Sequence, residues 1–137
     1  MTLNQITLPA TDVAASAAFY RRIGCRQIVD TPHYARFEAP AGDATLSVHA
    51  VGAVPARTGV VTYFEFPSAD ALDERVRELG AAGVRFDTAP TDERWLWREA
   101  RLRDPAGNVL CLYHAGPNRL FPPWRVEEQD ASGGPRP

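Results

Sequence analysis

The sequence of 137 residues contains no lysine and only two cysteines, Cys25 and Cys111. Two cysteines that do not form a CxxC pair are too few for a disulfide framework. No apolar run approaches the ~18 residues that a membrane-spanning helix needs. The N-terminus has neither the basic region nor the apolar region of a signal peptide. We therefore expect a cytoplasmic protein with reduced thiols and no membrane association.

An excess of charge of one sign is also lacking, since the formal net charge is -2. No global field favours nucleic acid or an anionic membrane surface, and we expect neither as a partner. All 15 basic residues are arginines, which indicates either many bidentate anion contacts or a compositional bias of the source genome. Hydrophobic residues at 45% and charged residues at 23% are typical of a folded soluble protein.

The pattern of apolar residues predicts the same order of elements twice. Residues 3–8 alternate as a strand, 13–23 carry a helical stripe, and 25–29, 33–38 and 44–51 are strands. The second half repeats this order with a strand at 60–66, a helix that begins after Ser68, and strands at 84–86, 94–102 and 109–113. Similar turns, 40–43 (PAGD) and 105–108 (PAGN), precede the last strand of each half. The sequence therefore predicts a duplicated β-α-β-β-β unit.

This order predicts an α+β fold of two βαβββ modules in one domain over residues 1–126. Module one spans 3–51, module two spans 59–115, and 116–126 form a docking tail. Phe121 and Trp124 in this tail would close one mouth of a cleft or dock on a second subunit. Residues 127–137 are polar and rich in Gly and Pro, and we expect them to be flexible.

Four segments carry a resemblance to a known family: 8–12 (LPATD), 18–24 (AFYRRIG), 63–66 (YFEF) and 104–108 (DPAGN). Together they resemble the vicinal oxygen chelate superfamily, the group of glyoxalases, bleomycin-resistance proteins and extradiol dioxygenases. The resemblance implies that the two modules form a paired, barrel-like domain whose sheets curl around a shared cleft, and it implies a homodimer. It is weak on the reaction, because one fold carries many functions.

The resemblance also implies four metal-ligand positions on the first and last strands of each module. They fall on Gln5, on Ser47 (or on Leu46 if the repeat is aligned without a gap), on Val61 and on Cys111. Only the Gln5 amide and the Cys111 sulfur are usable ligands, which is too small a set for a catalytic site. We therefore expect no cofactor and no metal site of the family type. An off-pattern divalent metal site of His49, Glu99 and Cys111 stays open as an alternative.

The strand faces opposite the predicted helices would line the cleft. These lining residues are Gln5, Thr7, Ser47, His49, Val61, Tyr63, Glu65, Cys111 and Tyr113. Residues 94–102 admit two alternations. If Ala100 and Leu102 face the helix, then Trp95, Trp97, Glu99 and Arg101 face the cleft.

Glu99, Glu65 and His49 are the candidate catalytic residues, because such groups take or give a proton beside a carbonyl. The alternative is that Arg98 or Arg101 pairs with the carboxylates and that His49 is a rim histidine. The candidate ligand-binding residues are Gln5, Thr7, Ser47, Tyr63, Trp95, Trp97, Arg101, Cys111 and Tyr113, whose aromatic members offer flat walls to a planar ligand.

Three functions follow as hypotheses. The first is a lyase or isomerase that acts on a metabolite in an aromatic-lined cleft without the usual metal-ligand set. The second is a non-catalytic protein that binds and sequesters a small molecule. The third is a metal-dependent glyoxalase or dioxygenase with displaced ligands.

Overall fold

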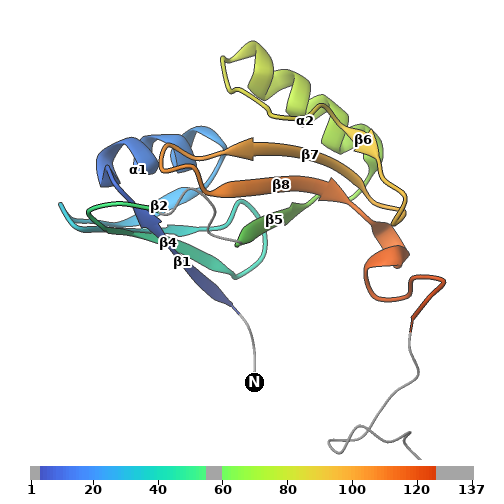
Figure 1. Cartoon of the computed structure of the whole chain (residues 1–137), viewed down its shortest axis with the longest axis horizontal. Helices are drawn as coiled ribbons and strands as arrows, with labels where there is room; N and C mark the ends of the chain where they lie inside the picture. The colour runs from blue at the N-terminus through green and yellow to red at the C-terminus, as the bar shows by residue number, and fades with distance from the viewer. Residues whose placement is uncertain (1–3, 55–59, 126–137) are drawn as a thin grey trace, which may run out of the picture.

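The computed structural model describes residues 4–54 and 60–125, and its first half is one βαβββ unit (Figure 1). The elements are β1 (Gln5–Ala10), α1 (Val13–Arg22), β2 (Arg26–Asp30), β3 (Tyr34–Glu38) and β4 (Thr45–Ala50). The strands form a sheet in the order β1-β4-β3-β2, in which β1 and β4 run parallel. The first and last strands of the unit are therefore neighbours.

The second half repeats this topology. It contains β5 (Val61–Glu65), α2 (Ala69–Ala81), β6 (Thr91–Asp92), β7 (Arg98–Arg103) and β8 (Val109–His114), followed by a short 3-10 helix, η1 (Gly116–Arg119). The sheet order is β5-β8-β7-β6, with β5 and β8 parallel. The predicted α+β fold of two βαβββ modules is confirmed.

Each helix begins at a polar residue that caps it. The Asp12 carboxylate accepts a hydrogen bond from the Ala15 amide at 2.9 Å, and the Ser68 hydroxyl accepts one from the Ala71 amide at 3.0 Å. These bonds satisfy backbone donors that the first helical turn leaves free. The two caps determine where each helix begins after β1 and β5.

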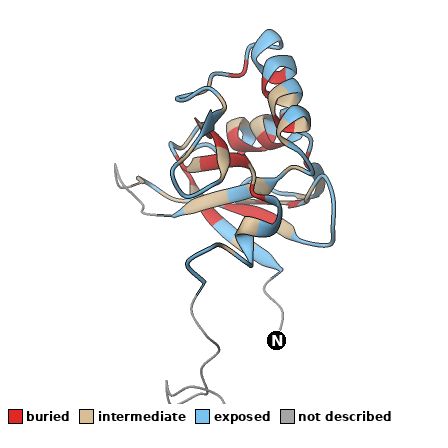
Figure 2. Ribbon diagram, turned by 90° about the vertical axis from the view of Figure 1, so that its right-hand side faces the viewer, coloured by how far each residue is buried: buried red, intermediate tan, exposed pale blue. Residues whose placement is uncertain are grey.

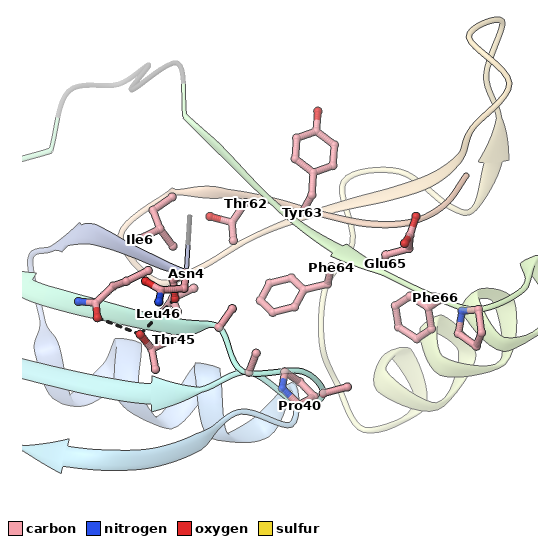
Figure 3. Close-up of a pocket in the computed structure, with 15 residues that line it drawn as sticks. Asn4, Ile6, Pro40, Thr45, Leu46, Thr62, Tyr63, Phe64, Glu65 and Phe66 are labelled. Atoms are coloured by element: carbon pink, nitrogen blue, oxygen red, sulfur yellow. Dashed lines mark hydrogen bonds between the residues drawn. The ribbon is translucent and has the colours of Figure 1, made fainter. Parts of the chain in front are cut away.

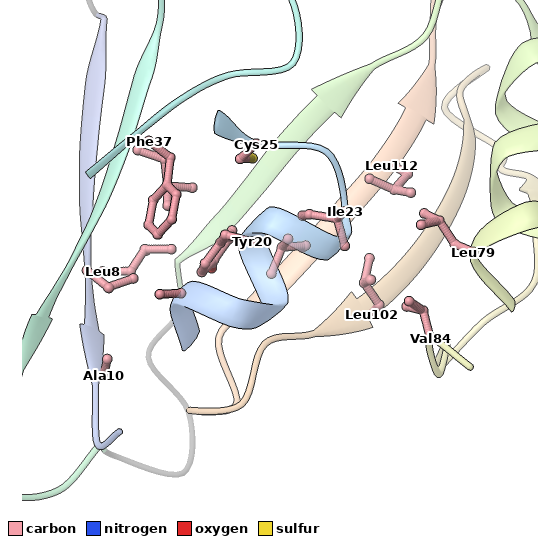
Figure 4. Close-up of a cluster of buried hydrophobic side chains, with 14 of the residues drawn as sticks. Leu8, Ala10, Tyr20, Ile23, Cys25, Phe37, Leu79, Val84, Leu102 and Leu112 are labelled. Atoms are coloured by element: carbon pink, nitrogen blue, oxygen red, sulfur yellow. The ribbon is translucent and has the colours of Figure 1, made fainter. Parts of the chain in front are cut away.

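One core joins the two halves. Leu8, Tyr20 and Phe37 from the first half are buried in the same cluster as Leu102 and Leu112 from the second (Figure 4). The buried residues lie between the helices and the sheets, and the outer helix faces are exposed (Figure 2). The opposite face of each sheet is left for polar side chains.

A buried polar contact ties the last turn of module two to module one. The Tyr20 hydroxyl donates to the Asp104 carboxylate at 2.8 Å, and the Asn108 amide donates to the Pro9 carbonyl at 2.9 Å. Asp104 also accepts hydrogen bonds from the Asn108 backbone and side chain. This explains why the DPAGN turn has an acid at its start and an amide at its end.

The structure corrects the prediction of a strand at 84–86. Val84 is buried and Phe86 packs against the core, but Phe86 makes only an isolated bridge, to Leu102. The third strand of this module is β6, at Thr91–Asp92. The two apolar residues are explained by core packing, which needs no strand pairing.

The structure also shortens the strand predicted at 94–102, because β7 begins only at Arg98. The preceding residues form the turn of the β6–β7 hairpin, closed by hydrogen bonds from the Leu96 amide to Glu93 at 3.0 Å and from the Glu93 amide to Trp97 at 2.8 Å. Leu96 has a φ of 68°, in the left-handed region. The turn brings Trp95 and Trp97 beside β7.

The predicted docking tail follows β8 as far as residue 125. After η1, the side chains of Leu120, Phe121 and Trp124 are exposed at 56%, 65% and 57%. The segment 127–137, predicted to be flexible, lies outside the described residues. Among residues 4–54 and 60–125, no helix is long and apolar enough to cross a membrane.

Candidate functional site

The face of the first sheet that points away from α1 carries a cluster of polar side chains. We call it the first polar face; it consists of Gln5, Thr7, Tyr34, Arg36, Ser47 and His49. At its centre the fully buried Ser47 hydroxyl hydrogen-bonds to the Thr7 hydroxyl at 2.7 Å and accepts a bond from the Gln5 amide at 3.4 Å. This network holds three of the predicted binding residues together.

Arg36 and Tyr34 lie beside Ser47 on β3. The Arg36 guanidinium donates to the Tyr34 hydroxyl at 2.9 Å. Hydrogen bonding to Ser47 and to Arg36 lowers the pKa of Tyr34 below its usual value. His49 is exposed at the end of β4, where it pairs in register with Tyr34. The structure therefore places His49 at the rim of the first polar face.

The corresponding face of the second sheet carries aromatic side chains together with charged ones. We call it the second polar face; it consists of Tyr63, Glu65, Trp95, Trp97, Glu99, Arg101, Cys111 and Tyr113. The rings of Trp97 and Tyr113 stack with centroids 4.7 Å apart, and Tyr63 meets both edge-on. Tyr63 is 45% exposed and Trp97 is half-buried, whereas Tyr113 is buried, so a ligand can reach this platform of rings at Tyr63 and Trp97.

Glu99 lies buried beside the rings, with 3% of its surface exposed. One carboxylate oxygen accepts a hydrogen bond from the Trp95 indole at 2.7 Å, and the other accepts from Arg101 at 3.2 Å. The structure thus shows Glu99 paired with an arginine. Arg98 is turned to the other side, where it binds Asp73 at 2.8 Å.

Ala100 and Leu102 are fully buried in the core, so Glu99 and Arg101 point to the opposite face of the sheet. Of the two alternations that the sequence left open, β7 adopts this one. The second candidate carboxylate, Glu65, is exposed and lies 3.5 Å from the Arg119 guanidinium. Both candidate carboxylates therefore have an arginine partner.

Cys111 lies under the platform and is fully buried. Burial, and then the neighbouring Glu99, raise the pKa of its thiol to about 12. The sulfur is therefore a neutral thiol at physiological pH and not a thiolate nucleophile.

The four family-type ligand positions do not fit a metal ion. The Val61 side chain has no donor atom and the Ser47 hydroxyl is engaged by Thr7, which leaves only the Gln5 amide and the Cys111 sulfur as ligands. In the described parts of the chain, no three side chains of His, Cys, Asp or Glu gather around one point. His49, Glu99 and Cys111 accordingly do not form the off-pattern site.

A cavity of about 710 Å³ opens between the two sheets where β1 and β5 approach each other (Figure 3). Phe64 points into it from β5, whereas Tyr63 points the opposite way. Gln5 of the first polar face and Tyr63 and Glu65 of the second all border it. Because Ile6, Leu46, Phe64 and Phe66 of the core side also line it, the cavity lies on the core side of both sheets, and the polar faces point away from it. Its size suits a small organic molecule.

The predicted site residues fall into two groups. Gln5, Thr7 and Ser47 lie on the first polar face with His49 at its rim, and the remaining candidates lie on the second. Sequence reasoning missed Tyr34 and Arg36 as site residues. Their alternation with the buried Ala35 and Phe37 was the signal that could have found them.

Comparison with known proteins supports this architecture. A glyoxalase/bleomycin resistance protein/dioxygenase from Nocardioides has a TM-score of 0.75 and 23% identity, covering 92% of this chain and 89% of its own. A lactoylglutathione lyase from Agrobacterium tumefaciens has a TM-score of 0.69 and 18% identity, covering 82% and 92%. A bleomycin-binding protein complexed with bleomycin has a TM-score of 0.66 and 24% identity, covering 83% and 98%.

These likenesses show the fold. No curated protein sequence matches the chain. The sequence pattern of one protein family, however, matches residues 2–112, which is most of the chain. The predicted resemblance is confirmed, and the chain belongs to the Glyoxalase/Bleomycin resistance protein/Dioxygenase superfamily.

Proposed function

We propose that this protein binds a small organic molecule with a planar, aromatic part against the second polar face. The observation that carries this proposal is the cluster of Tyr63, Trp97 and Tyr113 rings, of which the Tyr63 ring is exposed. Stacking on such rings favours planar ligands. The bleomycin-binding protein of the same fold, solved with its ligand, supports small-molecule binding.

A thermal-shift screen with thiol adducts, catechols and bleomycin tests this proposal, because a ligand that binds the folded state raises the melting temperature. For any compound that binds, Trp97→Ala should weaken binding about tenfold, since it removes one stacked ring. Ile28→Ala is the control, because Ile28 is an exposed apolar residue on β2. Equal loss in both variants would contradict a site on the platform.

A second candidate function, lyase or isomerase activity, rests on the buried Glu99 carboxylate beside the platform. Proton abstraction next to a carbonyl would require one Glu99 oxygen to exchange its hydrogen bond from Trp95 or Arg101 for the substrate. The lactoylglutathione lyase among the structural neighbours supports this candidate.

Glu99→Gln separates the two functions, because it keeps the shape of the side chain and removes the base. Turnover of a bound thiol adduct that is lost in Glu99→Gln, with binding retained, would identify an enzyme. Recovery of the adduct unchanged after long incubation with the wild-type protein would identify a binding protein. We favour binding, because both Glu99 oxygens already accept hydrogen bonds.

We also infer a homodimer in the cytoplasm. The exposed Leu120, Phe121 and Trp124 give an apolar surface suited to a second subunit, and the unpaired, buried Cys25 and Cys111 suit a reducing compartment. Light scattering should give twice the chain mass for the wild type and a smaller mass for Phe121→Ser/Trp124→Ser. A wild-type monomer would contradict the dimer.

A further inference from the structure

The cavity between the two sheets is an apolar space that its own chain does not fill. Ile6, Leu46, Phe64 and Phe66 line it from the core side, and Pro40 lines it from the turn before β4 (Figure 3). Its volume of about 710 Å³ leaves room for more than one large side chain. Apolar surface of this kind is unfavourable in water, so it favours an apolar occupant.

The same chain also carries an apolar protrusion. The tail segment 120–125 follows η1 and points away from α1 and α2 (Figure 1). Leu120, Phe121 and Trp124 in it are the most exposed large hydrophobic residues of the described ranges. One chain therefore presents both an apolar knob and an apolar cavity.

The tail segment already has a defined shape. The Phe121 amide donates to the Pro117 carbonyl at 2.8 Å, and the Arg125 amide donates to the Pro122 carbonyl at 3.0 Å. The Arg125 guanidinium lies over the Phe121 ring, 4.4 Å from its centroid. Pro122 and Pro123 restrict the backbone further. Docking of this segment therefore loses less conformational entropy than docking of a flexible one.

The start of the tail is held on the side of the second sheet that faces away from the cavity. The Trp97 indole donates to the Asn118 carbonyl at 3.4 Å, and the Arg119 guanidinium lies 3.5 Å from the Glu65 carboxylate. Trp97 and Glu65 belong to the second polar face, which points away from the cavity. In this conformation the tail points away from the cavity of its own chain, and the cavity of a second copy is the matching surface.

The charges beside the two surfaces are complementary. Residues 117–125 include Arg119 and Arg125 and no acidic residue. Asp43 is exposed between Ala41 and Ala44, which both line the cavity. Because Arg119 pairs with Glu65 of its own chain, Arg125 is the cation that would meet Asp43 of a second copy.

We propose that the tail segment 120–125 of each copy inserts into the cavity of the other. Phe121 and Trp124 are the anchors, and the phenyl rings of Phe64 and Phe66 receive them. Insertion in both directions closes a dimer around a two-fold axis, whereas insertion in one direction would build open chains. This inference rests on the homodimer proposed above and names its two surfaces.

Sedimentation and light scattering of the full chain over a range of concentrations test the insertion by measuring the Kd of the dimer. Ala44→Trp places a large side chain in the cavity and should raise this Kd at least tenfold. Ala53→Trp is the matched control, because Ala53 is exposed and does not line the cavity, and it should keep the wild-type Kd. An unchanged dimer in Ala44→Trp would overturn the insertion and leave the homodimer standing. A monomeric wild type would overturn both, and open chains would overturn the reciprocal exchange.

Charge reversal tests which molecule supplies the tail. Asp43→Arg and Arg125→Asp should each raise the Kd of the dimer about fivefold, because each places like charges together. An equal mixture of the two variants should recover the wild-type Kd, since in the mixed dimer both contacts again join opposite charges. A mixture that dimerises no better than its components would overturn the exchange between copies.

Discussion

At the scale of single residues, the stability of the fold depends strongly on the buried carboxylate of Asp104. Only 5% of the surface of Asp104 is exposed. Its carboxylate accepts hydrogen bonds from the Tyr20 hydroxyl, from the Ala106 and Asn108 backbone amides, and from the Asn108 side chain. Burying a charge is unfavourable unless such donors surround it. Removal of the acceptor leaves several buried donors unsatisfied.

Asp104→Ala is therefore expected to lower the free energy of unfolding by about 3 kcal/mol, whereas Tyr20→Phe, which removes one donor, should lower it by about 1 kcal/mol. Urea unfolding measures both values. Asp43→Ala, at an exposed turn residue, is the control and should stay within about 0.5 kcal/mol of the wild type. Equal effects of the two core variants would contradict this account.

Cys111 should make the free energy of unfolding fall as the pH becomes alkaline. Its thiol pKa is raised from 9.0 to about 12 in the folded protein. Both states are protonated below pH 9, but above it the unfolded chain releases this proton and the folded chain does not. The stabilisation is therefore complete below about pH 9 and is lost as the pH rises toward about 12.

Urea unfolding at several pH values checks this. From pH 9 to pH 10.5, Cys111 should contribute a loss of about 2 kcal/mol, at about 1.4 kcal/mol per pH unit. Cys111→Ala should show a shallower decline by that amount. Cys25→Ala should make the decline shallower by nearly the same amount over this range, because burial raises the pKa of Cys25 to about 11, which also lies above pH 10.5. A decline identical to wild type in Cys111→Ala would refute the assignment.

Alternation along the strands predicted which side chains share a face, but it could not predict their partners. Glu99 and Arg101 were expected on one face, with Arg101 as one possible partner, but the hydrogen bond from Trp95 to Glu99 depends on the turn before β7. Arg36 was not recognised as a site residue, although it alternates along β3 with the buried Ala35 and Phe37. The sheet register shows that it lies beside Ser47 of the first polar face.

At the scale of elements, the β6–β7 hairpin carries local backbone strain. Leu96 adopts a φ of 68° and is 47% exposed, so packing of its side chain does not explain the conformation. A branched side chain in the left-handed region costs roughly 1–2 kcal/mol, and glycine adopts this region freely.

Leu96→Gly should therefore stabilise the protein by about 0.5 kcal/mol or more, once the greater flexibility of glycine in the unfolded chain is subtracted. Thermal unfolding measures the shift. Leu96→Ala removes the same exposed side chain without relieving the backbone, and it should not stabilise. A gain of equal size in both variants would show that the side chain, rather than φ, is responsible.

The sequence predicted both helices and most strands, because capping residues and apolar spacing are local signals. It failed where local signals were ambiguous. Val84 and Phe86 are apolar because they pack on the core, and the short β6 carries Thr91 and Asp92, which have no apolar pattern. That segment is a strand only because it pairs with β7.

At the scale of the whole molecule, the shared core makes the two modules one cooperative unit. Leu72 of α2 is fully buried in the cluster that contains Leu8 and Phe37 of module one. A contact network that crosses the halves transmits a loss of packing in one to the other.

Leu72→Ala should lower the free energy of unfolding by about 2–5 kcal/mol, the range for removing a buried leucine side chain. Hydrogen exchange of the amides in β4 and β8 should accelerate by a similar factor, because both strands then open through the same global unfolding. Acceleration in β8 alone would indicate that the modules unfold independently.

The parallel pairing of the first and last strands also bears on biosynthesis. Module one brings together residues about 40 positions apart, such as Thr7 and Ser47, while the Asn108–Pro9 contact between modules spans 99 positions. A chain emerging from the ribosome can close its first sheet once residue 50 is free, long before the turn at 104–108 exists. Until that turn is made, the N-terminal half exposes the apolar surface that module two later covers. Nascent chains stalled at this stage are the species on which chaperones would act.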